Sequence, residues 1–109
     1  MKLTSEKAKE FFDEMISNVV AREDALYEEY KKGDMPRLEY LARNYRIHVD
    51  EAQKRIEKLK AFDGEEVKSK IAELQRYIKR EEESAKRTLE ELEQKKKNGE
   101  KIDYFIYFI

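Results

Sequence analysis

Few residues of this chain have side chains that could perform catalysis or bind a metal. His48 is the only histidine and cysteine is absent, so no second imidazole or thiolate can complete a zinc site or a nucleophile and base pair. Glutamates cluster, as in Glu81 to Glu83, but they alternate with lysines on predicted solvated helices, where nothing would tune them for acid or base work. The three glycines are too far apart to form a phosphate-binding loop. We therefore predict that the chain is not an enzyme and uses no metal or cofactor.

The composition indicates long, solvated helices. Charged residues make up 45% of the 109 residues and apolar residues 39%, which is typical of extended helical chains and unlike an average globular domain. The net charge of -1 gives no overall attraction to nucleic acid or to an anionic membrane. No signal peptide or membrane span is evident, and the lack of cysteine suits a reducing compartment. We expect a small cytoplasmic protein without a membrane partner.

The spacing of apolar residues predicts four helices. The first spans residues 4–32, with Thr4 or Ser5 as its cap and Gly33 as its stop. A short helix over residues 35–45, a turn over 46–48 and a helix over 49–62 follow, so residues 1–62 form one unit. The predicted inward stripe of the first helix consists of Phe11, Phe12, Met15, Ile16, Val19, Val20, Leu26, Tyr27 and Tyr30.

Residues 65–97 are predicted to form a long amphipathic helix. Its apolar residues follow a near-heptad repeat, and glutamate or lysine fills most other positions. Two interpretations are open: a solvated helix with one apolar stripe, or a coiled coil that joins two copies of the chain through Val67 to Leu92. The repeat consists of Val67, Ile71, Leu74, Ile78, Ala85, Leu89 and Leu92.

A turn and an apolar tail over residues 98–109 form the last predicted segment. Residues 101–109 read KIDYFIYFI, a β-branched and aromatic run that is typical of a strand. An unpaired apolar strand promotes aggregation, so we expect the tail to be covered, either by its own bundle or by a second molecule. The predicted partner-binding residues are Tyr104, Phe105, Ile106, Tyr107 and Phe108.

The central stretch, over about residues 25–59, resembles a helix-turn-helix, the trihelical unit of many small DNA-binding regulators. The resemblance implies that the helix over 49–62 is a recognition helix that enters the major groove. The residues that carry it are Leu26, Tyr27 and Gly33, then Leu41 and Ala42, then Ile47 and His48 in the turn, and finally Val49, Asp50, Glu51, Ala52, Arg55 and Ile56.

Two functions are compatible with this all-α helical bundle. Residues 31–60 hold nine basic and five acidic residues, which favours a homodimeric regulator that binds double-stranded DNA. The near-zero net charge and the acids on the predicted recognition helix favour a protein-interaction adaptor or inhibitor instead, such as those that viruses and other mobile elements encode. The predicted DNA-binding residues are Arg43, Arg46, His48, Gln53, Lys54, Arg55 and Lys58.

Overall fold

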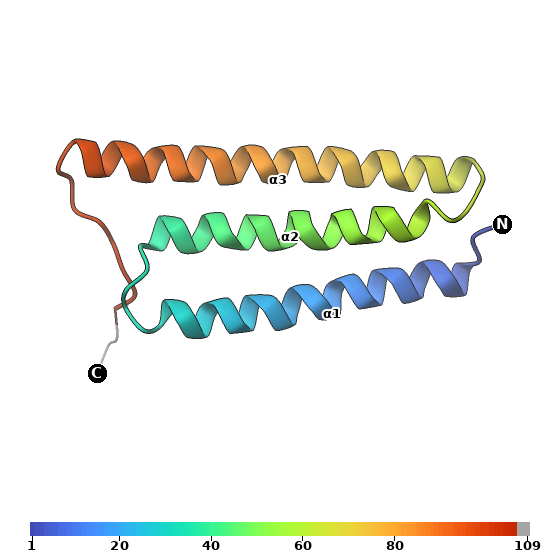
Figure 1. The fold of residues 1–109 in the computed structure, drawn as a ribbon, viewed down its shortest axis with the longest axis horizontal. Helices are drawn as coiled ribbons and strands as arrows, with labels where there is room; N and C mark the ends of the chain where they lie inside the picture. Colours follow the sequence, from blue (N-terminus) through green and yellow to red (C-terminus); the bar gives the residue numbers. More distant parts are fainter. Residues whose placement is uncertain (107–109) are drawn as a thin grey trace.

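The protein consists of three antiparallel helices that lie side by side in a single layer (Figure 1). The computed structural model describes residues 1–106. In order along the chain the helices are α1 (Ser5–Tyr30), α2 (Arg37–Leu59) and α3 (Glu65–Lys97). This arrangement confirms the all-α prediction, and the bounds of α3 agree with the helix predicted over residues 65–97.

Helix α2 is the centre of the layer. It packs against both α1 and α3, whereas the backbones of α1 and α3 do not approach each other within the described residues. The molecule measures 55 × 30 × 16 Å and has a radius of gyration of 17.5 Å, against about 13 Å for a compact domain of this length. The layer is therefore one helix thick, and both of its broad faces are open.

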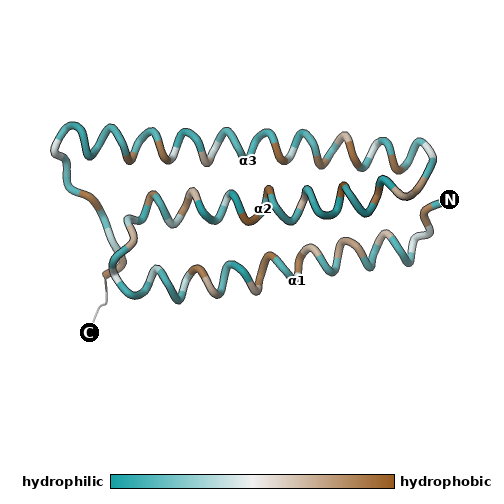
Figure 2. The backbone as a smooth tube through the Cα atoms, viewed as in Figure 1, coloured by the Kyte–Doolittle hydropathy of each residue, from teal (hydrophilic) through white to brown (hydrophobic). Residues whose placement is uncertain are grey.

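The core lies along the two seams of α2. Ala52 and Leu59 are fully buried in the larger cluster, which α1 and α3 complete with residues such as Phe11 and Leu74. A smaller cluster closes the end of the layer where α1 meets α2. Figure 2 shows apolar positions over much of α1, while α3 is mostly hydrophilic with apolar residues at intervals.

The helix ends follow from local sequence. The hydroxyl of Thr4 accepts a hydrogen bond from the amide of Lys7 at 3.1 Å, which confirms the predicted cap of α1. Gly33 and Gly64, in the two connections, adopt φ values of 87° and 112°, a region that glycine enters without strain. At the start of the chain, the terminal amine of Met1 pairs with the turn after α2 through Asp63 at 2.5 Å.

The predicted turn over residues 46–48 is wrong. Arg46, Ile47 and His48 lie inside the continuous helix α2, so the structure contains no helix-turn-helix in this stretch. No glycine or proline interrupts the segment, and no non-glycine residue in the described part of the chain has a positive φ. Ile47 is buried against the end of α1, which stabilises the uninterrupted helix.

Two further expectations need correction. Within the described residues the tail forms no strand, and Tyr107 and Phe108 lie outside them. The apolar repeat of α3 packs against α2 of the same chain, with Val67, Ile78 and Leu92 buried, so this stripe is not free to join two copies. None of the described helices is long and apolar enough to cross a lipid bilayer.

Candidate functional site

The residues predicted to bind DNA are distributed around α2 and do not form one basic surface. Lys54 lies 2.9 Å from the carboxylate of Glu51, and Lys58 forms an ion pair with Glu14 on α1. Both cations are therefore already neutralised by an acid. Gln53, which directly precedes Lys54, is exposed.

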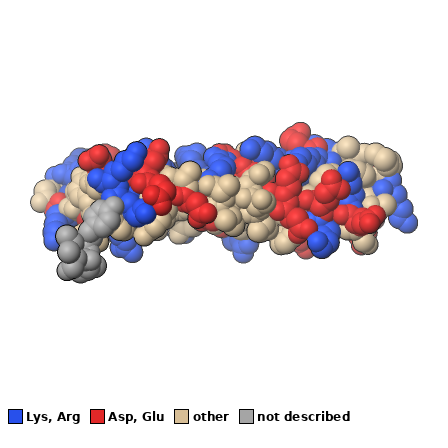
Figure 3. All heavy atoms as spheres, turned by 90° about the horizontal axis from the view of Figure 1, so that it is seen from below, with Lys and Arg blue, Asp and Glu red and all other residues tan. Residues whose placement is uncertain are grey.

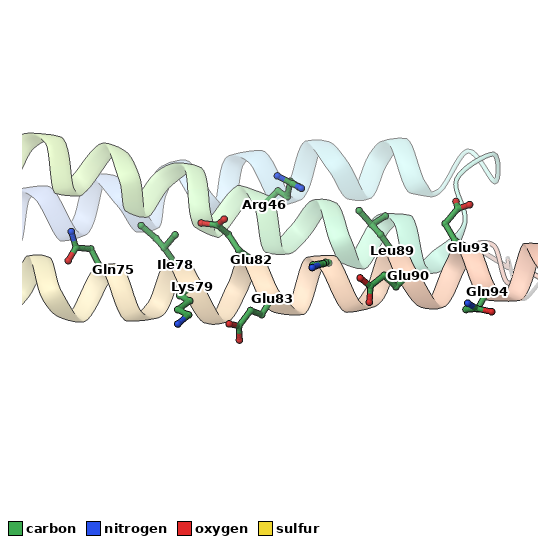
Figure 4. A pocket seen from close by; sticks show the side chains of 11 residues that line it. Arg46, Gln75, Ile78, Lys79, Glu82, Glu83, Leu89, Glu90, Glu93 and Gln94 are labelled. Carbon is green, nitrogen blue, oxygen red and sulfur yellow. The ribbon is translucent and has the colours of Figure 1, made fainter.

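Arg43 and Arg46 occupy the polar side of α2. The guanidinium of Arg43 lies 3.3 Å from Glu39 and 3.7 Å from Glu29, so it too is balanced by carboxylates. Arg46 is exposed and lines an open groove of about 720 Å³ between α2 and α3. In Figure 4, Lys79 and Glu83 of this groove point away from α2. The groove is shallow and mostly charged, and we assign no ligand to it.

His48 and Arg55 lie on the opposite side of α2. The two ring nitrogens of His48 lie 3.5 Å from Glu23 on α1 and 3.8 Å from Glu81 on α3. Its ring stacks on that of Tyr77 at 6.4 Å between centroids. His48 therefore links the three helices on one side of the layer, which we call the His48 face.

Arg55 is seven residues, or about two turns, from His48 and so belongs to the same face. Its guanidinium lies 5.4 Å from the ring centroid of Phe12 on α1. Burial lowers the pKa of Arg55, and the nearby charge of Glu73 on α3 opposes that shift. The side chain thus contributes packing between helices and is not free to contact a phosphate.

No cluster of potential metal ligands forms in the part of the chain that the structure describes. No group of three histidine, cysteine, aspartate or glutamate side chains lies close enough to hold a metal ion. Glu51 is the buried charged residue of the described chain, and its carboxylate pairs with Arg22 of α1 and Lys54 of α2. We assign it a structural role because it lies in the seam between helices and faces no cavity.

A cluster of aromatic rings lies where the tail returns to the layer. The ring of Phe105 lies 5.4 Å from that of Tyr30 and 6.0 Å from that of Tyr27, and Tyr40 stacks on Tyr30 at 4.2 Å. The amide of Arg37 donates to the carbonyl of Asp103 at 2.7 Å, which fixes the tail across the start of α2. We call Tyr27, Tyr30, Tyr40 and Phe105 the aromatic end.

The tail adds exposed apolar surface to the aromatic end. Phe105 is half-buried, but Tyr104 is 41% exposed and Ile106 is 63% exposed, and Tyr27 beside them is 41% exposed. Among the predicted partner-binding residues, the structure therefore brings Phe105 inward and leaves Tyr104 and Ile106 accessible. This arrangement agrees with a tail that packs on its own chain and still presents a surface.

Helix α1 carries a second exposed apolar surface, which was not predicted from the sequence. Phe12, Ile16 and Val20 are 46%, 44% and 51% exposed, although all three were assigned to the inward stripe. They form a second line, spaced by four residues, beside the line that faces α2. The sequence did contain a signal for this exposed surface. The apolar residues of α1 span a wide arc of the helix, and one neighbouring helix cannot cover so wide an arc. We call these three residues the α1 stripe.

The α1 edge of the molecule is acidic around its uncharged surface. Helix α1 contains three basic and eight acidic residues. Figure 3, which views the layer from the α1 side, shows uncharged surface in the middle with acidic groups to either side. Such a surface repels a nucleic acid backbone.

No family model, curated protein or solved structure matches the chain. The function of each candidate surface is therefore argued from its geometry and charge alone.

Proposed function

We propose that the chain is a non-enzymatic protein-interaction module, an adaptor or inhibitor, which binds a partner protein through the aromatic end and the tail. The observation that supports this proposal is the exposure of Tyr104 and Ile106 on a segment that Phe105 and Asp103 hold against the layer. Tyrosine is enriched in the centres of protein interfaces because it combines a large apolar ring with a hydrogen-bonding group.

Residues 103–106 are held against the layer before a partner arrives, which favours binding. A free chain loses conformational entropy when it docks, and a segment that is already anchored avoids part of that loss. The anchor consists of the backbone hydrogen bond between Arg37 and Asp103 and the ring contacts of Phe105. The exposed side chains of Tyr104 and Ile106 thus occupy defined positions.

Protein is the favoured partner class because the charges oppose nucleic acid. Of the seven residues predicted to bind DNA, Arg43, Lys54 and Lys58 are paired with acids, while Arg55 packs on Phe12. Helix α1 adds its excess of acidic groups along one edge.

The experiment that tests the proposal is affinity capture from an extract of the source cells, with bound proteins identified by mass spectrometry. We expect one or a few proteins to bind the wild-type chain and to be lost from the double variant Tyr104→Ser with Ile106→Ser. Lys101→Ser is the matched control, because it changes an exposed residue of the same segment without removing apolar surface. Equal capture by the double variant and the wild type would contradict the proposal.

A further inference from the structure

The α1 stripe is only partly covered within the described chain, by the guanidinium of Arg55 over the ring of Phe12. Phe12, Ile16 and Val20 lie on the outer helix of a layer that is one helix thick, and the His48 face beside them is open. Stable domains usually place two layers of secondary structure around one core. We propose that the second layer is a second copy of this chain, docked face to face on the His48 face.

The exposed area of the chain is large enough for this dimer. The accessible surface is 7873 Å², whereas a compact monomer of 13.2 kDa exposes about 6,400 Å². The excess of about 1,500 Å² exceeds the roughly 800 Å² that each partner buries in a standard interface. The excess accessible surface arises because the molecule is a flat layer, and pairing two layers face to face would bury much of it.

Symmetry limits how two such layers can meet. A two-fold axis that runs along α2 places α1 of one copy over α3 of the other, because α2 lies between them in each layer. A two-fold axis that runs across the helices places α1 over α1. The second arrangement opposes two helices that each carry three basic and eight acidic residues, so like charges disfavour it.

The first arrangement is complementary in charge. On the His48 face, a groove of about 670 Å³ between α2 and α3 is lined by five cations and a single acid. Tyr77, in the same groove, offers an aromatic surface opposite the partner's apolar residues. The lining cations are Arg55, Lys70, Arg76, Lys79 and Arg80, and the acid is Glu73.

The partner's acidic α1 supplies the opposite charges. Asp13 and Asp24 of α1 are exposed and follow the α1 stripe along its outer border. Asp13 also forms an exposed ion pair with Lys9 of the same helix, at 2.7 Å, which the dimer would extend to a third charge. In the proposed dimer the two aspartates, about 16 Å apart along α1, lie on either side of Arg76 and Arg80 of the other copy, which are about 6 Å apart along α3. In the part of the chain that the structure describes, neither arginine forms an ion pair, so both are available. Each contact occurs twice, as an isologous interface requires.

The dimer surface is separate from the proposed partner-binding surface. The α1 stripe lies in the first two thirds of α1, whereas the aromatic end involves Tyr27 and the tail. A variant that lacks residues 104–109 is therefore expected to remain a dimer, and a monomeric variant is expected to keep its tail-dependent partner. The two proposals can fail independently.

The first test is the mass of the protein in solution, measured by sedimentation equilibrium over a range of concentrations. We expect twice 13.2 kDa for the wild type, and the monomer mass for Ile16→Lys with Val20→Lys at concentrations where the wild type is dimeric. Lys side chains at these positions face the partner's cations, which weakens dimerisation by roughly 100-fold or more. Ser17→Lys, at an exposed position beyond the stripe, adds a cation to α1 and should remain dimeric. A monomeric wild type would overturn the proposal.

The second test distinguishes the two symmetries. The double variant Asp13→Arg with Asp24→Arg should be monomeric, and so should the double variant Arg76→Glu with Arg80→Glu. Both should remain helical by circular dichroism. Mixing the two should restore a dimer, because both α1 to α3 contacts in the mixed pair again join opposite charges. If the Arg76→Glu, Arg80→Glu protein still dimerises as tightly as the wild type, α1 does not face α3 and the arrangement is wrong.

Discussion

Nη1 of Arg22, on α1, lies 2.9 Å from Oε2 of Glu51, a carboxylate on α2 whose side chain is only 1% exposed. Nζ of Lys54 lies 2.9 Å from the same oxygen, while Nη2 of Arg22 reaches Asp50 at 3.1 Å. A buried carboxylate is stable only where cations and hydrogen bonds replace its lost water. The Arg22 to Glu51 contact therefore fixes the position of α1 along α2.

Removing Arg22 should destabilise the fold. In Arg22→Met, Glu51 keeps Lys54 but loses its cation from α1, and we expect the free energy of unfolding to fall by about 1–3 kcal/mol. The loss is smaller than for a fully buried pair because Arg22 is 40% exposed. Urea denaturation measures it. Lys9→Met, which breaks the exposed pair with Asp13, is the control and should change stability far less, because solvent screens that pair. Equal effects would mean that burial of Glu51 has no energetic consequence.

Acid should weaken the same contact. Burial raises the pKa of Glu51, but hydrogen bonds from Lys54, Arg22 and Asn18 outweigh it and hold the pKa below the usual 4.5. A carboxyl with a lowered folded-state pKa stabilises the fold above its unfolded-state pKa, and this contribution is lost as the pH falls through the folded-state value.

The measurement is a set of urea denaturation curves at pH values from 7 down to about 3. The wild type should lose more stability over this range than Glu51→Gln, which has no proton to bind at this position. Parallel pH profiles for the two proteins would show that Glu51 does not contribute to acid sensitivity.

Helix α3 and the cap at Thr4 could be predicted from sequence because their signals are local. The apolar repeat continues from Val67 to Leu92, and Gly64 and Gly99 flank the helix, so its length is set without tertiary information. The partner of that repeat could not be predicted in the same way. A stripe that fits a coiled coil fits α2 of the same chain equally well, and only the three-dimensional structure shows which is used.

The continuity of α2 illustrates the opposite case. The helix-turn-helix resemblance placed a break at Arg46, Ile47 and His48, yet none of these residues stops a helix. Ile47 is buried against α1, and the ring of His48 lies near Glu23 of α1 and Glu81 of α3. These tertiary contacts favour an unbroken helix. The aromatic end depends on a contact between Tyr27 and Phe105, which are far apart in sequence, and no local pattern signals that contact.

A glycine substitution distinguishes a turn from a continuous helix. At a helix-turn-helix turn, Arg46→Gly would relieve backbone strain and leave stability unchanged or higher. Inside α2, glycine should cost about 1 kcal/mol relative to Arg46→Ala, because it increases the entropy of the unfolded chain. Urea denaturation of the two variants measures the difference. Arg46→Gly matching or exceeding Arg46→Ala in stability would indicate that the helix breaks at this position.

Duplex DNA should bind the chain weakly and without sequence preference. Lys54 and Lys58 form ion pairs with Glu51 and Glu14, so we expect no specific DNA complex. The double variant Lys54→Glu with Lys58→Glu should therefore bind duplex DNA about as weakly as the wild type. Gel shifts with a random duplex library at low and physiological salt provide the measurement. A protein that neutralises several phosphates loses affinity steeply as salt rises. A tight, salt-sensitive complex that the double variant loses would show that these ion pairs open to DNA, and would restore the nucleic-acid hypothesis over the protein-binding one.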